Sequence, residues 1–269
     1  MVELFEKELL SDERGSSKGN QLKWCRGGRW YKADYAGYEG LAEYTVSQLL
    51  AEEVPGGPEI IAYRTEEIHY KERTYLGCSS ANFLPEGWQL VTLERLFYLA
   101  YHESLYRSVF RIDGVKERAV FLCEQVEQLT GLKEFGPYLR TLLTIDALFL
   151  NEDRHMHNIA VLEDEQKHYH LSPVFDNGAS LLSDTTQDYP LSGDWVELMD
   201  RVSAKTISTS FDEQLDAVEE LYGQPLKFSY GAAKLRRILE EEPYYPAELK
   251  ERVGKLVLEK RRQYTYLFS

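Results

Sequence analysis

Residues 151–158 read Asn-Glu-Asp-Arg-His-Met-His-Asn, and residues 173–178 read Pro-Val-Phe-Asp-Asn-Gly. Asp153 precedes Asn158 by five positions (158 − 153), and Asp176 follows Asp153 by 23 positions (176 − 153). The interval between the two stretches has room for one short β-hairpin, which we expect over 159–162 and 168–171. The pattern therefore predicts a polar loop and an acidic turn that one hairpin connects.

The three polar side chains have the chemistry that phosphoryl transfer requires. That reaction uses a carboxylate near the attacking hydroxyl and oxygen ligands that hold Mg²⁺ on the nucleotide phosphates. Asp153 is the candidate for the acceptor hydroxyl, and Asn158 and Asp176 are the candidate Mg²⁺ ligands. The five-residue offset from Asp to Asn is also that of the kinase catalytic loop. The alternative is a structural loop that Asp and Asn side chains cap.

Two neighbours of Asp153 are also candidates for roles in the loop. His155 is a candidate member of the catalytic group, and we expect it to brace the loop by hydrogen bonds rather than to act as the base. Arg154 suits either a phosphate contact or a pair with a carboxylate, and the sequence leaves both open.

Composition limits the class of protein. The chain has 269 residues, of which 43% are hydrophobic and 28% charged, as in soluble globular proteins. A formal net charge of −14 argues against a nucleic-acid binder, because affinity for phosphate backbones comes from clustered Lys and Arg. No apolar run is long enough to span a membrane, and no signal peptide is apparent. The three cysteines, Cys25, Cys78 and Cys123, are widely spaced, which favours reduced thiols in a cytoplasmic protein.

The first third of the chain alternates between strand patterns and one helix pattern. Gly27-Gly28 suits a tight turn between two strands, and the apolar spacing after Tyr38 is helical. The expected elements are a loop over 11–19, strands over 21–25 and 29–33, a helix over 38–53, and strands over 59–66 and 68–77.

The remainder is mainly helical. After a polar link over 78–89, helices are expected over 93–110, 114–130 and 135–150, then an irregular segment over 183–210 and helices again over 211–268. This order predicts an α+β fold with two lobes. Residues 1–80 would form a small β-rich nucleotide-binding lobe with one helix, and residues 81–269 a larger helical catalytic lobe.

The loop around Asp153 and the following Asp-x-Gly resemble those of the HipA-like kinases, including the short CtkA-type serine/threonine kinases of bacteria. The phosphatidylinositol 3/4-kinases are similar more remotely. The resemblance covers most of the chain and implies a bilobed protein-kinase-like fold, ATP and Mg²⁺ as cofactors, and a protein substrate. From charge and composition, neither a nucleic-acid partner nor a membrane is expected. Full-length HipA-type toxins have an additional N-terminal subdomain, so toxin activity and antitoxin binding are not implied.

The resemblance assigns two further charged residues. Lys32 matches the strand lysine that binds nucleotide phosphates, and strand alternation puts it on the same face as Trp30. Glu43 matches the helix glutamate that pairs with this lysine. Glu39 lies one turn earlier on the same helix face, so it is an alternative partner.

The resemblance also points to a phosphate-binding loop over 14–20. Its backbone amides and small side chains would approach the phosphates, and Lys18 would add a charge. In the family a serine of this loop can be autophosphorylated, and Ser16 and Ser17 both match. The alternative is a flexible polar loop. The candidate nucleotide-binding residues here are Gly15, Ser16, Ser17, Lys18 and Gly19.

Adenine would bind where the two lobes join. The segment 76–83 follows the last strand of the small lobe, and Ser79, Ala81 and Phe83 are its candidate contacts. Ile159, Val161 or Val174 would form the floor of the adenine pocket, or would be ordinary core residues.

The sequence thus predicts an ATP- and Mg²⁺-dependent serine/threonine protein kinase that can autophosphorylate. A kinase for a lipid or a small molecule is one alternative, although no polybasic cluster is present to hold an anionic membrane. The acidic residues of 183–210 suit a cationic or neutral acceptor. A nucleotide-binding regulatory module without catalysis is the other alternative.

Overall fold

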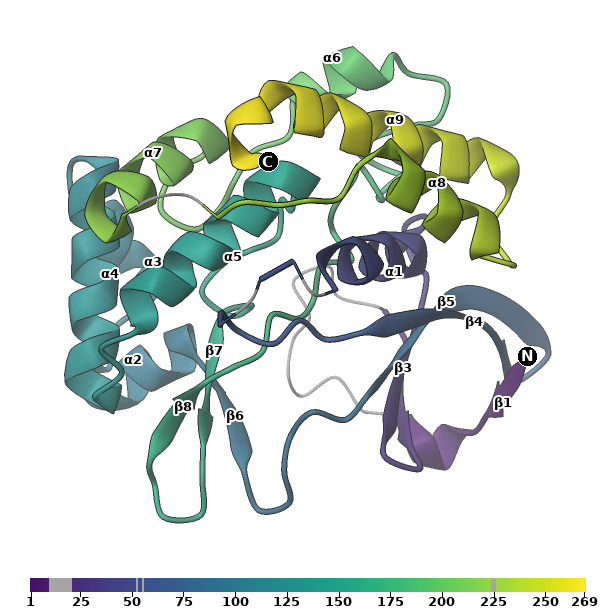
Figure 1. Cartoon of the computed structure of the whole chain (residues 1–269). Helices are drawn as coiled ribbons and strands as arrows, with labels where there is room; N and C mark the ends of the chain where they lie inside the picture. The colour runs from purple at the N-terminus through teal and green to yellow at the C-terminus, as the bar shows by residue number, and fades with distance from the viewer. Residues whose placement is uncertain (10–20, 52, 55, 224–225) are drawn as a thin grey trace.

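The structure is a computed structural model that describes residues 1–9, 21–51, 53–54, 56–223 and 226–269. A curled β-sheet with one helix on its outer side is followed along the chain by a mostly helical lobe (Figure 1). The predicted α+β fold class is therefore confirmed.

The larger sheet has five strands in the order β1-β4-β5-β3-β2. β1 pairs in parallel with β4, and the other neighbours are antiparallel. The sequence pattern did not predict β1, which has only three residues. The strands are β1 (Val2–Leu4), β2 (Lys23–Arg26), β3 (Arg29–Ala33), β4 (Tyr63–Tyr70) and β5 (Arg73–Ala81).

The two faces of this sheet have different roles. The inner face of the curl holds a small core in which the rings of Trp24 and Tyr70 lie 5.2 Å apart, beside the buried Tyr31. On the opposite face α1 (Glu39–Leu50) packs against β4 and β5. Strand alternation places Lys32 on this second face, because its neighbour Tyr31 points into the curl. The face that α1 covers is therefore the one that can carry a polar site.

The predicted boundaries of the hairpin β4–β5 were wrong by about four residues. The expected first strand began at Glu59, but this segment pairs with Val174: the amide of Ile61 donates to the Val174 carbonyl at 3.0 Å, and the amide of Val174 donates to the Glu59 carbonyl at 2.7 Å. The chain reverses at Lys71, which adopts a left-handed φ of 53°. Residues 59–61 have the local propensity of a strand, but they pair with the distant Val174 instead of extending β4.

The helical lobe surrounds α5 (Phe135–Phe149), which is buried along nearly its whole length and is apolar on most sides. The hairpin of β7 (Ala160–Glu163) and β8 (Tyr169–Leu171) was predicted, and β6 (Gln89–Thr92) extends it to a three-stranded sheet. The other helices are α2 (Leu93–Tyr101), α3 (Leu105–Phe110), α4 (Val115–Thr130), α6 (Trp195–Asp200), α7 (Phe211–Tyr222), α8 (Ala232–Glu241) and α9 (Ala247–Gln263).

Two predictions in this lobe were wrong. The helix expected over 93–110 is two helices, because His102 ends the first in a left-handed conformation (φ 56°) and the side chain of Ser104 caps the second. The segment expected to be irregular contains α6, which the side chain of Asp194 caps by accepting a bond from the amide of Val196. No helix in the described ranges has the length and apolar character needed to cross a membrane.

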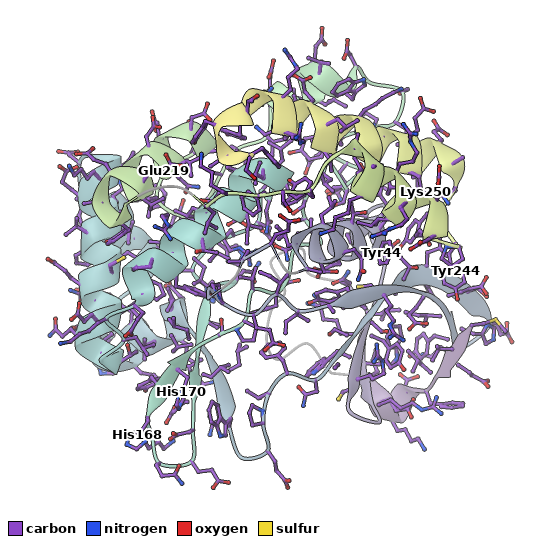
Figure 2. The ribbon with its side chains drawn as sticks, in the orientation of Figure 1. Tyr44, His168, His170, Glu219, Tyr244 and Lys250 are labelled. Carbon is purple, nitrogen blue, oxygen red and sulfur yellow. The ribbon has the colours of Figure 1, made fainter. Side chains whose placement is uncertain are left out.

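Polar side chains join the elements at two places that Figure 2 shows. His168 and His170 lie on β8 and the turn before it, where both contact the carboxylate of Asp164 at 3.4 and 3.1 Å. Tyr44 and Lys250 lie where α1 meets the C-terminal helices: Tyr44 donates to the carbonyl of Ile238 in α8. The division of the chain at residue 80 stays a prediction.

Candidate active site

The loop 151–158 begins where α5 ends. Leu150 closes the helix in a left-handed conformation (φ 54°), so the chain turns sharply into the loop. Within the loop the side-chain amide of Asn158 donates to the backbone carbonyl of Asp153 at 2.8 Å and to its carboxylate at 3.2 Å. The structure therefore brings Asp153 and Asn158 together, and it directs the amide nitrogen of Asn158 toward Asp153.

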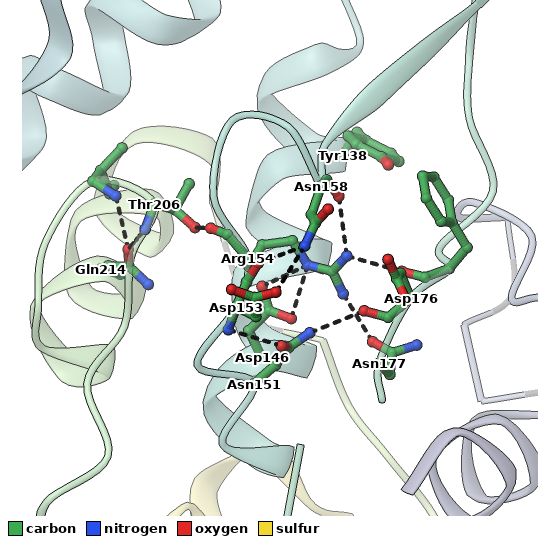
Figure 3. Close-up of polar contacts among 12 residues, drawn as sticks. Tyr138, Asp146, Asn151, Asp153, Arg154, Asn158, Asp176, Asn177, Thr206 and Gln214 are labelled. Carbon is green, nitrogen blue, oxygen red and sulfur yellow. Dashed lines mark hydrogen bonds and ion pairs between the residues drawn. The ribbon is translucent and has the colours of Figure 1, made fainter. Parts of the chain in front are cut away.

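Arg154 is a structural brace. Its side chain is 2% exposed, and its Nε lies 3.1 Å from a carboxylate oxygen of Asp146 in α5 (Figure 3). The remaining guanidinium nitrogens donate to the carbonyls of Asn158 and Phe175 and to the side chain of Asn177. Of the two roles that the sequence left open, the structure places Arg154 with a carboxylate. One buried guanidinium thus holds the loop and the Asp-Asn-Gly turn in a fixed relation.

A second connection holds the loop from the side of α7. The hydroxyl of Thr206 donates to the backbone carbonyl of Arg154 at 2.5 Å. The side-chain oxygen of Gln214 in turn accepts bonds from the amides of Thr206, Ile207 and Ser208 (Figure 3). The polypeptide before α7 is therefore tied both to that helix and to the loop.

Asp176, Lys32 and Glu43 meet across the interface between the sheet and the helical lobe. The ammonium of Lys32 lies 2.7 Å from Asp176 and 2.8 Å from Glu43. Asp176 has a left-handed φ of 59°, and the next amide, of Asn177, donates to Glu43 at 2.8 Å. The backbone turn at Asp176 therefore brings its carboxylate to the lysine and its following amide to the glutamate.

Glu39 has a different role from Glu43. Its carboxylate accepts bonds from the amides of Ala36 at 2.7 Å and Gly37 at 3.1 Å, just before α1 begins. A carboxylate at this position suits the exposed amides at a helix N-terminus. Between the two glutamates that the sequence offered, the structure pairs Glu43 with Lys32.

The pKa shifts in this cluster follow from its charges. Burial disfavours the ammonium of Lys32, but the carboxylates of Asp176 and Glu43 outweigh burial and hold the pKa of Lys32 well above its usual value. For Asp176, burial is likewise outweighed by Lys32 and Lys23, which lower the pKa of its carboxyl group. For Glu43, burial dominates and raises the pKa. Asp176 is therefore the more firmly ionised of the two carboxylates.

Four of these residues line one cleft together with others, most of which the sequence did not identify. Asp153, Asn158, Asp176 and Glu43 all line it. The further lining residues are Gln21, Lys23, Tyr35, Glu39, Gly178, Ala179, Ser183 and Asp184. Lys23 could have been found, because a two-residue turn at Gly27-Gly28 pairs residue 23 with residue 32 across the hairpin.

Asp153 has two basic neighbours at the edge of the cleft. The carboxylate oxygen Oδ1 of Asp153 lies 3.7 Å from His155 and 3.7 Å from Lys205. His155 also accepts a bond from the amide of His157 at 3.2 Å, and burial lowers its pKa. These contacts bring His155 to the loop interior beside Asp153. Nothing in the local pattern of the sequence pointed to Lys205.

The residues expected around adenine lie in different surroundings, on β5, after it and in the main core. Ser79 lies on the face opposite Lys32, where its hydroxyl donates to Glu66 at 2.7 Å, so only its backbone could contact a nucleotide in the cleft. Ala81 is exposed at the end of β5. Phe83 packs on Phe175, with ring centroids 5.5 Å apart, in an apolar cluster with Ile61, Tyr63 and Cys78. Ile159, Val161 and Val174 are fully buried in the main core.

The loop residues Gly15, Ser16, Ser17, Lys18 and Gly19 lie outside the described residues. Their phosphate-binding assignment therefore stays a prediction. Lys23 and Gln21, which follow directly in the chain, line the cleft.

Comparison with known proteins places this geometry in a known fold. No model of a protein family matches the chain, and no curated protein matches it. The crystal structure of a Helicobacter pylori proinflammatory kinase, CtkA, superposes with a TM-score of 0.63 at 16% sequence identity, covering 99% of this chain and 96% of that one. HipA of Shewanella oneidensis MR-1, in complex with HipB and operator DNA, gives a TM-score of 0.54 at 15% identity, covering 95% and 66%. The resemblance to HipA-like and CtkA-type kinases is thus confirmed for the fold.

Proposed function

We propose that this chain is an ATP- and Mg²⁺-dependent phosphotransferase, specifically a serine/threonine protein kinase of the HipA-like type. The observation that carries the proposal is that Lys32 bridges Glu43 and Asp176 at a cleft that Asp153 and Asn158 also line. A lysine–glutamate pair, a metal-binding aspartate and a loop with aspartate and asparagine are the parts that kinases use to position ATP. The kinase-like fold supports the same proposal.

Five residues at the cleft have a role in this proposal. Lys32 holds the nucleotide phosphates, and Glu43 keeps the lysine in place. Asp153 accepts the proton of the attacking hydroxyl. Asp176 and Asn158 would hold Mg²⁺, which neutralises charge on the phosphates when it is bound. A carboxylate and an amide oxygen suit this hard cation, which keeps water and phosphate oxygens as its other ligands.

The amide orientation of Asn158 is compatible with this assignment. Its nitrogen donates to Asp153. Since an amide has one nitrogen and one oxygen end, the oxygen of Asn158 remains the end that a cation would contact.

The loop over 14–20 would cover the phosphates and carry the site of autophosphorylation, at Ser16 or Ser17. A phosphate on either serine adds about two negative charges, which would repel the nucleotide phosphates and expel the loop. Hydrogen exchange on these amides with and without ATP tests this step. Unchanged protection of residues 14–20 on ATP binding would show that the loop is only a connector.

The experiment that tests the proposal is incubation with labelled ATP and Mg²⁺, followed by mass spectrometry of the chain. Wild type and Asp216→Asn, a matched change on the exposed side of α7, are expected to label Ser16 or Ser17. Asp153→Asn is expected to bind ATP and transfer nothing. ATP binding without transfer in the wild type would instead identify a nucleotide-binding regulatory module. Asp153→Asn with wild-type turnover would refute the role of Asp153.

A further inference from the structure

A second cavity lies in the helical lobe, apart from the cleft. It is open to solvent on one side and has a volume of about 500 Å³, where the end of α6, the start of α7 and the end of α9 meet. This size is within the range of sites that bind small molecules. Its lining includes Leu150, Asp200, Ser210, Asp212, Lys260 and Tyr264.

Lys260 is the unusual residue of this cavity. It is only 6% exposed, and its ammonium donates to the neutral side-chain oxygen of Gln263 at 2.9 Å and lies 4.4 Å from the ring centre of Tyr264. No carboxylate of the described residues lies within ion-pair distance of it. Burial lowers the pKa of Lys260 to about 8, although Asp212 and Asp200 act in the opposite direction. A buried cation held by a single neutral acceptor is costly, and a ligand carboxylate would offset that cost.

Two carboxylates lie near Lys260 without pairing with it. Asp200 is exposed at the end of α6, and its carboxylate makes no hydrogen bond or ion pair with the described residues. Asp212 is in the first turn of α7 and accepts a bond from the hydroxyl of Tyr264 at 2.6 Å. The cavity thus combines one buried positive charge with two more exposed negative charges.

We propose that this cavity binds a small zwitterion, a free amino acid, with its carboxylate on Lys260 and its ammonium near Asp200 and Asp212. A ligand with only negative charge would meet the two aspartates, and a ligand with only positive charge would meet the buried lysine. A zwitterion satisfies both. This site is separate from the cleft and does not depend on the proposed phosphoryl transfer.

The walls of the cavity are connected to the loop 151–158. Leu150 directly precedes that loop, and α7 carries Gln214, which holds the amide of Thr206. Thr206 donates to the backbone of Arg154 (Figure 3). A ligand in the cavity would therefore contact elements that hold the loop in place.

The test is calorimetric titration of the full chain with each common amino acid. Acetate and methylamine, which carry only a negative or only a positive charge, serve as control ligands. We expect at least one amino acid to bind saturably and to slow hydrogen exchange at residues 209–213. Lys260→Met should weaken this binding at least about tenfold, and Asp200→Asn should weaken it as well. Lys255→Met, on the exposed side of the same helix, should leave it unchanged.

Three outcomes would overturn the proposal. They are the absence of saturable binding by any amino acid, equal binding of acetate, and unchanged binding in Lys260→Met. Asp200 is exposed, so Asp200→Asn keeps the fold and still tests the site if Lys260→Met does not fold.

Discussion

Two lysines, Lys32 largely buried and Lys260 buried, have opposite electrostatic surroundings. Lys32, beside the cleft, lies within 2.8 Å of two carboxylates that line it, and its pKa is well above the usual value. Lys260 in the helical lobe donates to the neutral amide oxygen of Gln263 at 2.9 Å and lies over the ring of Tyr264, and its pKa is lowered to about 8. Burial disfavours both ammonium groups, so the partners decide the direction of the shift. The cleft holds two carboxylates against its lysine, whereas in the second cavity no carboxylate of the described residues lies within ion-pair distance of Lys260.

A third buried cation shows what a purely structural site looks like. The guanidinium of Arg154 donates to Asp146, to two backbone carbonyls and to Asn177. Its planar fork is satisfied on every side by fixed groups. Lys32 instead contacts two carboxylates at a cleft edge, where a nucleotide or an ion can compete for them. The three cations therefore differ in how much of their coordination the protein itself supplies.

The largest predicted effect is a loss of stability at Arg154, whose partners all belong to the protein. Asp146→Ala should lower the free energy of unfolding by about 3 to 5 kcal/mol, because it leaves the Arg154 charge buried without its partner. Urea denaturation followed by circular dichroism measures this. Asp146→Asn, which keeps an acceptor for Arg154, should cost less. A loss below about 1 kcal/mol for the alanine variant would show that the remaining bonds suffice for Arg154.

At the cleft the expected effect is on turnover. Lys32→Met should lower phosphoryl transfer at least about 100-fold, since it removes the cation placed for the nucleotide phosphates. Steady-state kinetics with saturating ATP measures the change, and Lys133→Met on an exposed loop is the control. Wild-type turnover in Lys32→Met would contradict the role assigned to Lys32. It would not affect the assignment of the fold, which rests on the comparison of structures.

A smaller effect, on ATP affinity, is expected from changes at Asp176. Asp176→Ala should weaken Mg²⁺-dependent ATP binding by about 10- to 100-fold, and Asn158→Ala should weaken it less, because a carboxylate gives the cation a full charge and an amide oxygen gives only a dipole. Calorimetric titration with ATP, with and without Mg²⁺, separates the Mg²⁺-dependent part of the affinity from the part that needs no metal. If the Asp176 variant keeps the Mg²⁺ dependence of the wild type, Asp176 does not hold the metal.

The smallest effect is the pH dependence that Lys260 confers. Its folded-state pKa of about 8 is below the ordinary 10.5, so the unfolded chain binds more protons between these values and stability rises with pH there. From pH 7 to pH 9 the wild type should gain about 1 kcal/mol relative to Lys260→Met. Denaturant melts at both pH values measure the difference. A constant difference would mean that Lys260 titrates normally in the folded chain.

The sequence predicted the residues of the cleft better than the boundaries of the elements. The spacing of Asp153, Asn158 and Asp176 reflects a loop and a turn that local chemistry specifies, so it could be read directly. The position of hairpin β4–β5 depends on the pairing of Glu59 and Ile61 with Val174, which lies more than a hundred residues away. The choice between Glu43 and Glu39 depended in the same way on a tertiary contact.

Other contacts had no local signal. Lys205, which contacts Asp153, lies in a segment with no regular sequence pattern. Asp146 is one polar residue in a helical pattern, and only its tertiary contact with Arg154 distinguishes it. Lys23 is the exception, since the register of its hairpin already placed it opposite Lys32.

The bond between Lys32 and Asp176 joins residues that are 144 positions apart, and that between Asn177 and Glu43 joins residues 134 apart. Contacts of such separation close long loops and form late, after local helices and hairpins. During synthesis Lys32 leaves the ribosome well before Asp176, so Lys32 lacks this carboxylate until the second half of the chain has been made. The cleft is therefore expected to be among the last parts of the molecule to assemble, and a chain that stalls before residue 176 would expose the Lys32–Glu43 pair, without its contacts to Asp176 and Asn177, to solvent and to quality control.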